Sequence, residues 1–213
     1  MKKVLVFDLD GTLVNTIFDI AYSMNEALVE HNLPIHETLK YIDFIGAGVL
    51  VLGQKSVGDN VSQDIIDSVI SRYKEIYKAN LTNLSEPYPK MAEVLDELIN
   101  RGYQLAVISN KPHEDTLEVV NHYFPNKFSH IAGAKSNVNR KPDSMAMNIL
   151  LAEFGLEMKD IAYIGDSRFD AKFSENCGCD YYLFTYGYDK EEVLKTYNAK
   201  AFLHTPTDLL KYF

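Results

Sequence analysis

The chain has 213 residues, of which 46% are hydrophobic and 24% are charged, a composition typical of a globular protein with one large domain or a domain carrying an insert. Its formal net charge of -9 argues against nucleic acid and anionic membranes as partners, because both are polyanions. The first apolar run stops at Asp8, too early for a secretion signal or a membrane span, so the expected location is the cytoplasm.

Short apolar runs and helical periodicities divide the chain into predicted elements. A buried strand is predicted over residues 4–7, a helix over 17–30, and a mostly helical pattern with glycine interruptions over 33–84. Two prolines then end this region, and strands alternate with helices. The predicted strands cover residues 104–109, 130–132, 161–164 and 181–184, and the predicted helices cover residues 91–100, 114–122, 144–154, 169–176 and 190–195.

This alternation predicts an α/β fold, a parallel sheet with helices on both faces. The helical region between the first strand and Pro87 interrupts the alternation, and it is interpreted as an insert that forms a second, α-helical domain.

Polar side chains follow the first predicted strand. Asp8 and Asp10 lie two residues apart at a turn that Gly11 permits. One carboxylate at such a place can attack an electrophile while the other exchanges a proton with the leaving group. Both aspartates could instead cap the turn, as Asp-Gly segments often do.

Three later strand ends carry comparable groups. Ser109 and Asn110 can donate hydrogen bonds to phosphate or cap the next helix, and Lys141 can neutralise a nucleophile and a phosphate or be a solvated surface charge. Asp166 and Asp170 supply hard oxygen ligands of the kind that Mg²⁺ takes, one helical turn apart. Ligands bind beyond the carboxyl ends of strands in open α/β sheets, so one shared site is a simpler explanation than four separate capping roles.

The four segments, in this order and spacing, resemble the motifs of the haloacid dehalogenase superfamily, and within it the phosphoglycolate phosphatase-like group. The resemblance to this group rests on five segments, the four motifs and one segment of the helical insert: Phe7–Val14, Ile45–Gly48, Ser109–Pro112, Arg140–Asp143 and Ile164–Ser167. It implies a Rossmann-like core over residues 1–14 and 85–213 and an inserted α-helical cap domain over residues 15–84.

The resemblance also implies roles in a Mg²⁺-dependent phosphatase. Asp8 would be the nucleophile that forms an aspartyl-phosphate, Asp10 would protonate the leaving oxygen and then activate water, Ser109 would bind the phosphoryl group, and Lys141 would hold Asp8 and phosphate together. The metal residues implied are Asp8, Asp10 through its main-chain carbonyl, Asp166, and Asp170 as a ligand or a close neighbour. The substrate-binding residues expected are Gly11, Thr12, Asn110, Gly46 and Gly48.

Several alternatives stay open from the sequence. Asp10 favours phosphorus over a carbon–halogen bond, but a phosphomutase similar to β-phosphoglucomutase, or a nucleotidase or pyrophosphatase of the same superfamily, would share it. A non-catalytic regulatory module is a further alternative. Gly46 and Gly48 could bring a cap loop close to the core or merely end a helix. Asn15 departs from the family pattern, in which an aspartate is common.

The expected partner is a small phosphorylated metabolite, with no nucleic acid and no membrane, and the expected state is a monomer or homodimer.

Overall fold

The computed structural model describes residues 2–135 and 140–213. It divides into two compact units, one formed by residues 1–15 and 87–213 and the other by residues 16–86. No helix among the described residues has the length and apolarity needed to cross a membrane.

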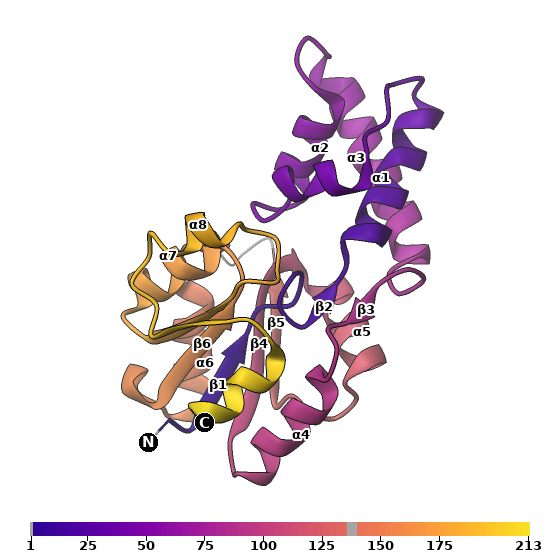
Figure 1. Ribbon diagram of the computed structural model, residues 1–213. Helices are drawn as coiled ribbons and strands as arrows, with labels where there is room; N and C mark the ends of the chain where they lie inside the picture. The colour runs from indigo at the N-terminus through magenta and orange to yellow at the C-terminus, as the bar shows by residue number, and fades with distance from the viewer. Residues whose placement is uncertain (1, 136–139) are drawn as a thin grey trace. The chain divides into compact units, whose positions relative to one another are not determined.

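Unit 1 is built on a six-stranded parallel sheet with the order β5-β4-β1-β6-β7-β8, which confirms the predicted fold class (Figure 1). Its strands are β1 (Val4–Phe7), β4 (Gln104–Pro112), β5 (His130–Ala134), β6 (Ile161–Gly165), β7 (Asp180–Phe184) and β8 (Ala201–Leu203). A separate pair joins β2 (Val14–Asn15) and β3 (Glu86–Pro87). Strand β4 runs three residues beyond the predicted end, with a change of register between Ile108 and Pro112, so Ser109 and Asn110 lie within the strand.

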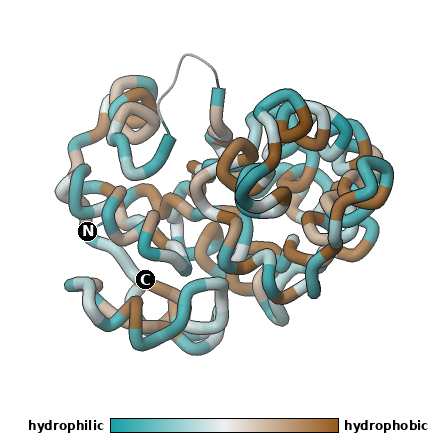
Figure 2. Tube along the Cα trace, turned by 90° about the horizontal axis from the view of Figure 1, so that it is seen from above, coloured by the Kyte–Doolittle hydropathy of each residue, from teal (hydrophilic) through white to brown (hydrophobic). Residues whose placement is uncertain are grey.

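Helices cover the sheet because its strands are apolar on both faces. The helices of unit 1 are α4 (Met91–Asn100), α5 (His113–Tyr123), α6 (Met145–Phe154), α7 (Arg168–Cys177), α8 (Glu191–Leu194) and the 3-10 helices η2 (Met158–Asp160) and η3 (Pro206–Lys211). One core cluster joins Val6 and Tyr163 of the sheet to Leu150 of α6 and Phe173 of α7. The hydropathy colouring shows that apolar and polar positions alternate along the helices (Figure 2).

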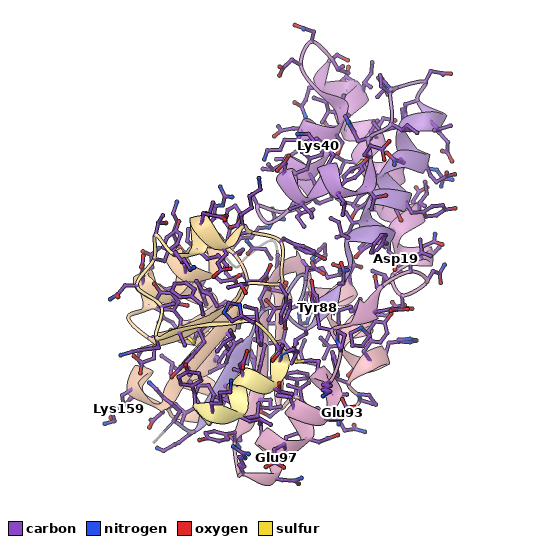
Figure 3. The ribbon with its side chains drawn as sticks, viewed as in Figure 1. Asp19, Lys40, Tyr88, Glu93, Glu97 and Lys159 are labelled. Atoms are coloured by element: carbon purple, nitrogen blue, oxygen red, sulfur yellow. The ribbon has the colours of Figure 1, made fainter. Side chains whose placement is uncertain are left out.

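Helix α4 illustrates why these segments are helical. Its buried residues Val94, Leu95 and Leu98 recur at helical spacing, while Glu93 and Glu97 lie on the polar side (Figure 3). The apolar stripe therefore packs inward and the acidic side chains stay in water.

Unit 2 is helical and has its own core. It contains α1 (Ile17–Glu30), η1 (Thr38–Asp43), α2 (Val49–Val57) and α3 (Gln63–Ala79), and α1 packs against α3 and η1. Met24, Leu28, Tyr41 and Val69 are fully buried within it. Asp19, labelled in Figure 3, is also fully buried; its carboxylate accepts hydrogen bonds from the backbone amides of Leu84 and Ser85 and from the Ser85 hydroxyl.

Candidate active site

The central strands of unit 1 bring together the side chains that the sequence placed at strand ends. β1 lies between β4 and β6, and all three strands are parallel, so their carboxyl ends meet at one edge of the sheet. Asp8 follows β1 directly and Asp166 follows β6 directly. Asp8 is anchored there by its backbone amide, which donates to the Ile164 carbonyl at 2.9 Å.

Lys141 supplies the ammonium group that pairs with Asp8. Its Nζ atom lies 2.9 Å from Asp8 Oδ1 and 2.7 Å from Asp170 Oδ1, and the lysine side chain is 2% exposed. One ammonium is therefore shared by two carboxylates that are 162 positions apart in the chain (8 to 170).

Asn110 holds the backbone of Lys141 in place. The Lys141 amide donates to Asn110 Oδ1 at 2.8 Å, and Asn110 Nδ2 donates back to the Lys141 carbonyl at 3.1 Å. The expected role of Asn110 in substrate binding stays a prediction, and its side-chain amide also engages the backbone of Lys141. It joins β4 to the segment that carries the lysine.

Asp170 is fixed by the start of α7. Ser167 and Asp170 form a capping box, in which the Ser167 hydroxyl accepts from the Asp170 amide and Asp170 Oδ2 accepts from the Ser167 amide at 3.0 Å. The Ser167 hydroxyl, at 2.6 Å, and the Asp166 amide also donate to this oxygen. Gly165 makes room for the carboxylate, because a Cβ there would lie 2.4 Å from Asp170 Cγ. Both oxygens of Asp170 are thus committed to hydrogen bonds within the protein.

The carboxylate of Asp166 packs against two glycines, Gly11 and Gly187, that are distant from it in the sequence. Its Oδ1 accepts from the Thr12 hydroxyl at 2.7 Å and its Oδ2 accepts from the Tyr188 amide at 2.7 Å. A Cβ on Gly11 or on Gly187 would come within 2.4 Å or 2.3 Å of Oδ2, so neither position tolerates a side chain. Gly11 also has φ of +86°, which favours glycine.

The expected contact of Thr12 with substrate stays a prediction, and its hydroxyl donates to Asp166. Gly187 and Tyr188 were not found from the sequence. The only sequence signal for them is that Gly187 stands between Tyr186 and Tyr188, shortly after the predicted strand 181–184.

Asp10 and Ser109 lie near the same edge. Asp10 pairs with Lys111, whose Nζ lies 3.1 Å from Asp10 Oδ1 and whose side chain is 2% exposed. The Ser109 hydroxyl is largely buried and accepts from the Lys111 amide at 3.3 Å. The sequence pointed to Asp10 and Ser109 but not to Lys111.

Gly46 and Gly48 belong to unit 2, in the turn between η1 and α2. Both have positive φ values, +99° and +94°, which favour glycine. Their expected role in substrate binding stays a prediction.

Burial sets the electrostatics of the site. Burial raises the pKa of Asp8 to about 7, an effect that Lys141 opposes and Asp170 reinforces. The pKa of Asp166 is also raised well above its ordinary value, first by burial and then by the charges of Asp170 and Asp8. Burial lowers the pKa of Lys141, but the two carboxylates outweigh it and raise the pKa above the ordinary lysine value.

These groups fit a divalent metal ion. Carboxylate oxygens of Asp8, Asp166 and Asp170 all lie within 4.8 Å of one another and are buried. If all three carboxylates are ionised, the single ammonium of Lys141 leaves an excess of negative charge, which is costly to bury unless a further cation binds. Asp8 and Asp166 would hold the ion, since the oxygens of Asp170 already accept from Lys141, Tyr163, Ser167 and the Asp166 amide. Hard oxygen ligands of this kind suit Mg²⁺.

A parallel α/β sheet with two aspartates after the first strand and a lysine–aspartate cluster beside them defines a class of hydrolase. Residues 5–184 match the family of haloacid dehalogenase-like hydrolases. The chain is 35% identical to the phosphoglycolate phosphatase of Haemophilus influenzae (strain 86-028NP) over 88% of this chain and 87% of the relative, and 32% identical to that of Mannheimia succiniciproducens over 98% and 97%.

A solved structure of a predicted phosphoglycolate phosphatase from Haemophilus somnus superposes with a TM-score of 0.91 at 32% identity, covering 99% of this chain and 97% of the other. The chain belongs to the haloacid dehalogenase-like hydrolases, and it is an enzyme of the phosphatase class, as the sequence predicted.

Proposed function

We propose that this chain is a Mg²⁺-dependent phosphatase that hydrolyses a small phosphomonoester, phosphoglycolate or a close analogue, with Asp8 as the nucleophile. The observation that carries the proposal is the buried lysine shared by Asp8 and Asp170, next to Asp166, at the carboxyl edge of the sheet. The name shared by the relatives supports the choice of phosphoglycolate.

The reaction would proceed in two steps on Asp8. In the first, an Asp8 oxygen attacks phosphorus and the ester oxygen leaves with a proton from Asp10. In the second, Asp10 takes a proton from water, which attacks the phosphorus of the aspartyl-phosphate, breaks its bond to Asp8 and releases phosphate. Lys141 neutralises Asp8 and the incoming phosphate, and Mg²⁺, when bound, would reduce the repulsion between the two anions.

The other site residues would support this chemistry rather than perform it. Ser109 would donate to the transferring phosphoryl group. Asp166 would hold the metal, and Asp170 would hold Lys141 in place through the ion pair at 2.7 Å. Asn110 and Thr12 would act by fixing Lys141 and Asp166.

Unit 2 would act as a cap domain that selects the leaving group and excludes water during phosphoryl transfer. Gly46 and Gly48 would then let the turn before α2 approach the substrate. The chain would act as a monomer or homodimer in the cytoplasm.

The test is phosphate release across a panel of phosphometabolites with Mg²⁺, for the parent and for Asp8→Asn. Turnover is expected for phosphoglycolate, and Asp8→Asn is expected to abolish it because an amide oxygen is a poor nucleophile. The matched control is Asp180→Asn, the same change in a residue at the amino end of β7. Residual activity of Asp8→Asn near the parent level would remove Asp8 as nucleophile.

The same panel separates the alternatives. Interconversion of sugar phosphates without steady phosphate release would identify a phosphomutase. Turnover of nucleoside monophosphates or pyrophosphate in preference to phosphoglycolate would replace the proposed substrate. Failure to hydrolyse any phosphoester with Mg²⁺ would overturn the proposal.

A further inference from the structure

Tyr163 is a fully buried phenol in the middle of β6, a strand whose other residues are all apolar or glycine. It pairs in register with Val6 of β1, and its ring packs edge-on against Phe173 of α7 at 5.1 Å. Packing of the ring explains an aromatic residue here but not a hydroxyl, since phenylalanine would fill the same space. A buried phenol hydroxyl needs polar partners, and those partners indicate what it does.

The hydroxyl of Tyr163 meets three parts of the active site. It lies 2.9 Å from Lys141 Nζ, 3.1 Å from Asp170 Oδ1 and 3.0 Å from the carbonyl oxygen of Ile108, the residue before Ser109. It therefore contacts the lysine, the aspartate that pairs with the lysine, and the strand that carries Ser109.

The buried ammonium group of Lys141 requires hydrogen-bond acceptors. An ammonium group has three N–H donors and accepts nothing. Three oxygens lie within 2.9 Å of its Nζ, namely Asp8 Oδ1, Asp170 Oδ1 and the Tyr163 hydroxyl. Two of these are anions that pull the ammonium toward themselves, and the phenol is the neutral acceptor that fixes its remaining direction.

We propose that Tyr163 is a positioning residue for Lys141, and that its hydroxyl holds the ammonium group aimed at Asp8 during phosphoryl transfer. The proposal rests on the proposed function, in which Lys141 neutralises Asp8 and the phosphate. In this role Tyr163 acts through the lysine, to which its hydroxyl is hydrogen-bonded. Its hydrogen bond to the Ile108 carbonyl fixes the phenol in turn, so the direction of the ammonium is tied to the backbone of β4.

The first test is Tyr163→Phe, which keeps the ring and its packing. Loss of one hydrogen bond to a buried charged group predicts a fall in kcat of roughly tenfold, with KM changed by less than about twofold. The matched control is Tyr181→Phe, on the neighbouring strand, where the buried phenol donates to Glu175 at 2.8 Å. The control is expected to keep the parent kcat, and a Tyr163→Phe kcat within about twofold of the parent would overturn the proposal.

The second test observes Lys141 without any turnover. In protein labelled with ¹⁵N at lysine Nζ, the buried ammonium of Lys141 should exchange its protons slowly, and Lys141→Arg identifies its signal by removing it. Tyr163→Phe is expected to speed this exchange by roughly tenfold, and Tyr181→Phe to leave it unchanged. An unchanged Lys141 signal in Tyr163→Phe would overturn the proposal.

The two tests distinguish the two possible failures. If the parent releases no phosphate from any ester, the proposed function has failed, and the exchange of the Lys141 ammonium still decides whether Tyr163 positions it. If the parent is active and Tyr163→Phe matches it, the positioning role has failed and the proposed function stands.

Discussion

Buried carboxylates occur in both units, and they are stabilised in different ways. In unit 2, Asp19 is fully buried and accepts from three neutral donors, the amides of Leu84 and Ser85 and the Ser85 hydroxyl, at 2.6 to 3.0 Å. In unit 1, the carboxylates of Asp8, Asp166 and Asp170 lie within 4.8 Å of one another. Lys141 pairs with two of them.

The difference separates a structural carboxylate from a functional one. Hydrogen bonds from neutral groups compensate the single charge of Asp19, and they join α1 to the end of unit 2. In the cluster of unit 1, burial raises the pKa values of Asp8 and Asp166, and the neighbouring carboxylates raise them further. Under the proposed function, this cluster of carboxylates would bind a cation, and Asp8 would attack phosphorus.

The largest expected effect is that of Lys141→Met on stability. Without Mg²⁺ and at about pH 8, the change leaves Asp8 and Asp170 without their cation and should lower the free energy of unfolding by about 3–5 kcal/mol. Urea unfolding measures the loss, and added Mg²⁺ should reduce it. Lys195→Met removes an exposed ion pair with Glu191 and should leave stability close to that of the parent. Equal losses for the two variants would contradict the comparison.

The second effect is a dependence of stability on pH. The folded pKa of Asp8, about 7, is higher than its ordinary value of 3.8, so the folded state binds a proton more tightly than the unfolded state. This group therefore lowers stability as pH rises from about 4 to about 7. In Mg²⁺-free buffer, Asp8→Asn should be more stable than the parent by roughly 2–4 kcal/mol at about pH 8, and the difference should vanish near pH 4.

Urea unfolding at a series of pH values tests this second prediction. A difference between Asp8→Asn and the parent that is the same at every pH would show that the charge of Asp8 is compensated in the folded state. Added Mg²⁺ should shrink the difference at high pH, since the ion favours the ionised carboxylate.

The third effect concerns the carboxylate of unit 2. Asp19→Ala removes the carboxylate that accepts from the Leu84 amide and from the amide and hydroxyl of the buried Ser85, and it should lower the free energy of unfolding by about 2–3 kcal/mol. Urea unfolding measures the loss, which should be the same with and without Mg²⁺, in contrast to Lys141→Met. Asp67→Ala, at an exposed position of α3, is the control, with an expected loss below about 0.5 kcal/mol. A loss for Asp19→Ala that Mg²⁺ reverses would break the distinction between the two regions.

The smallest expected effect concerns the binding of Mg²⁺ by Asp166. A Cβ at Gly187 would collide with the Asp166 carboxylate, so Gly187→Ala should weaken Mg²⁺ binding by roughly tenfold through displacement of a ligand. The rise in melting temperature on adding Mg²⁺ reports the affinity. Gly155→Ala, where a Cβ has open space but φ is +62°, should lower stability and leave Mg²⁺ affinity unchanged. Equal Mg²⁺ affinity in both variants would remove Gly187 from the metal site.

The sequence predicted most of the fold because its signals are local. The apolar run of β1, the helical spacing of α1 and the alternation after Pro87 each depend on neighbours within a few residues, and the predicted elements agree with the structure to within a few positions. Strand β4 was predicted to end at Ser109, three residues too early, because Asn110 and Lys111 are polar; their side chains are buried, which their local pattern does not reveal.

Local signals identified Asp8, Asp10 and Asp166 as candidates because they stand at predicted strand ends. Lys141 lies nine residues after the predicted strand 130–132, and the family resemblance supported it. What the sequence alone could not decide was which group each of these contacts. The pairs Asn110 with Lys141, Tyr188 with Asp166 and Tyr163 with Lys141 join residues 22 to 31 positions apart. Only the order of the strands brings such residues together, and that order is set by the packing of the whole sheet. The sequence determines which chemical groups are present, and the tertiary structure determines which of them contact one another.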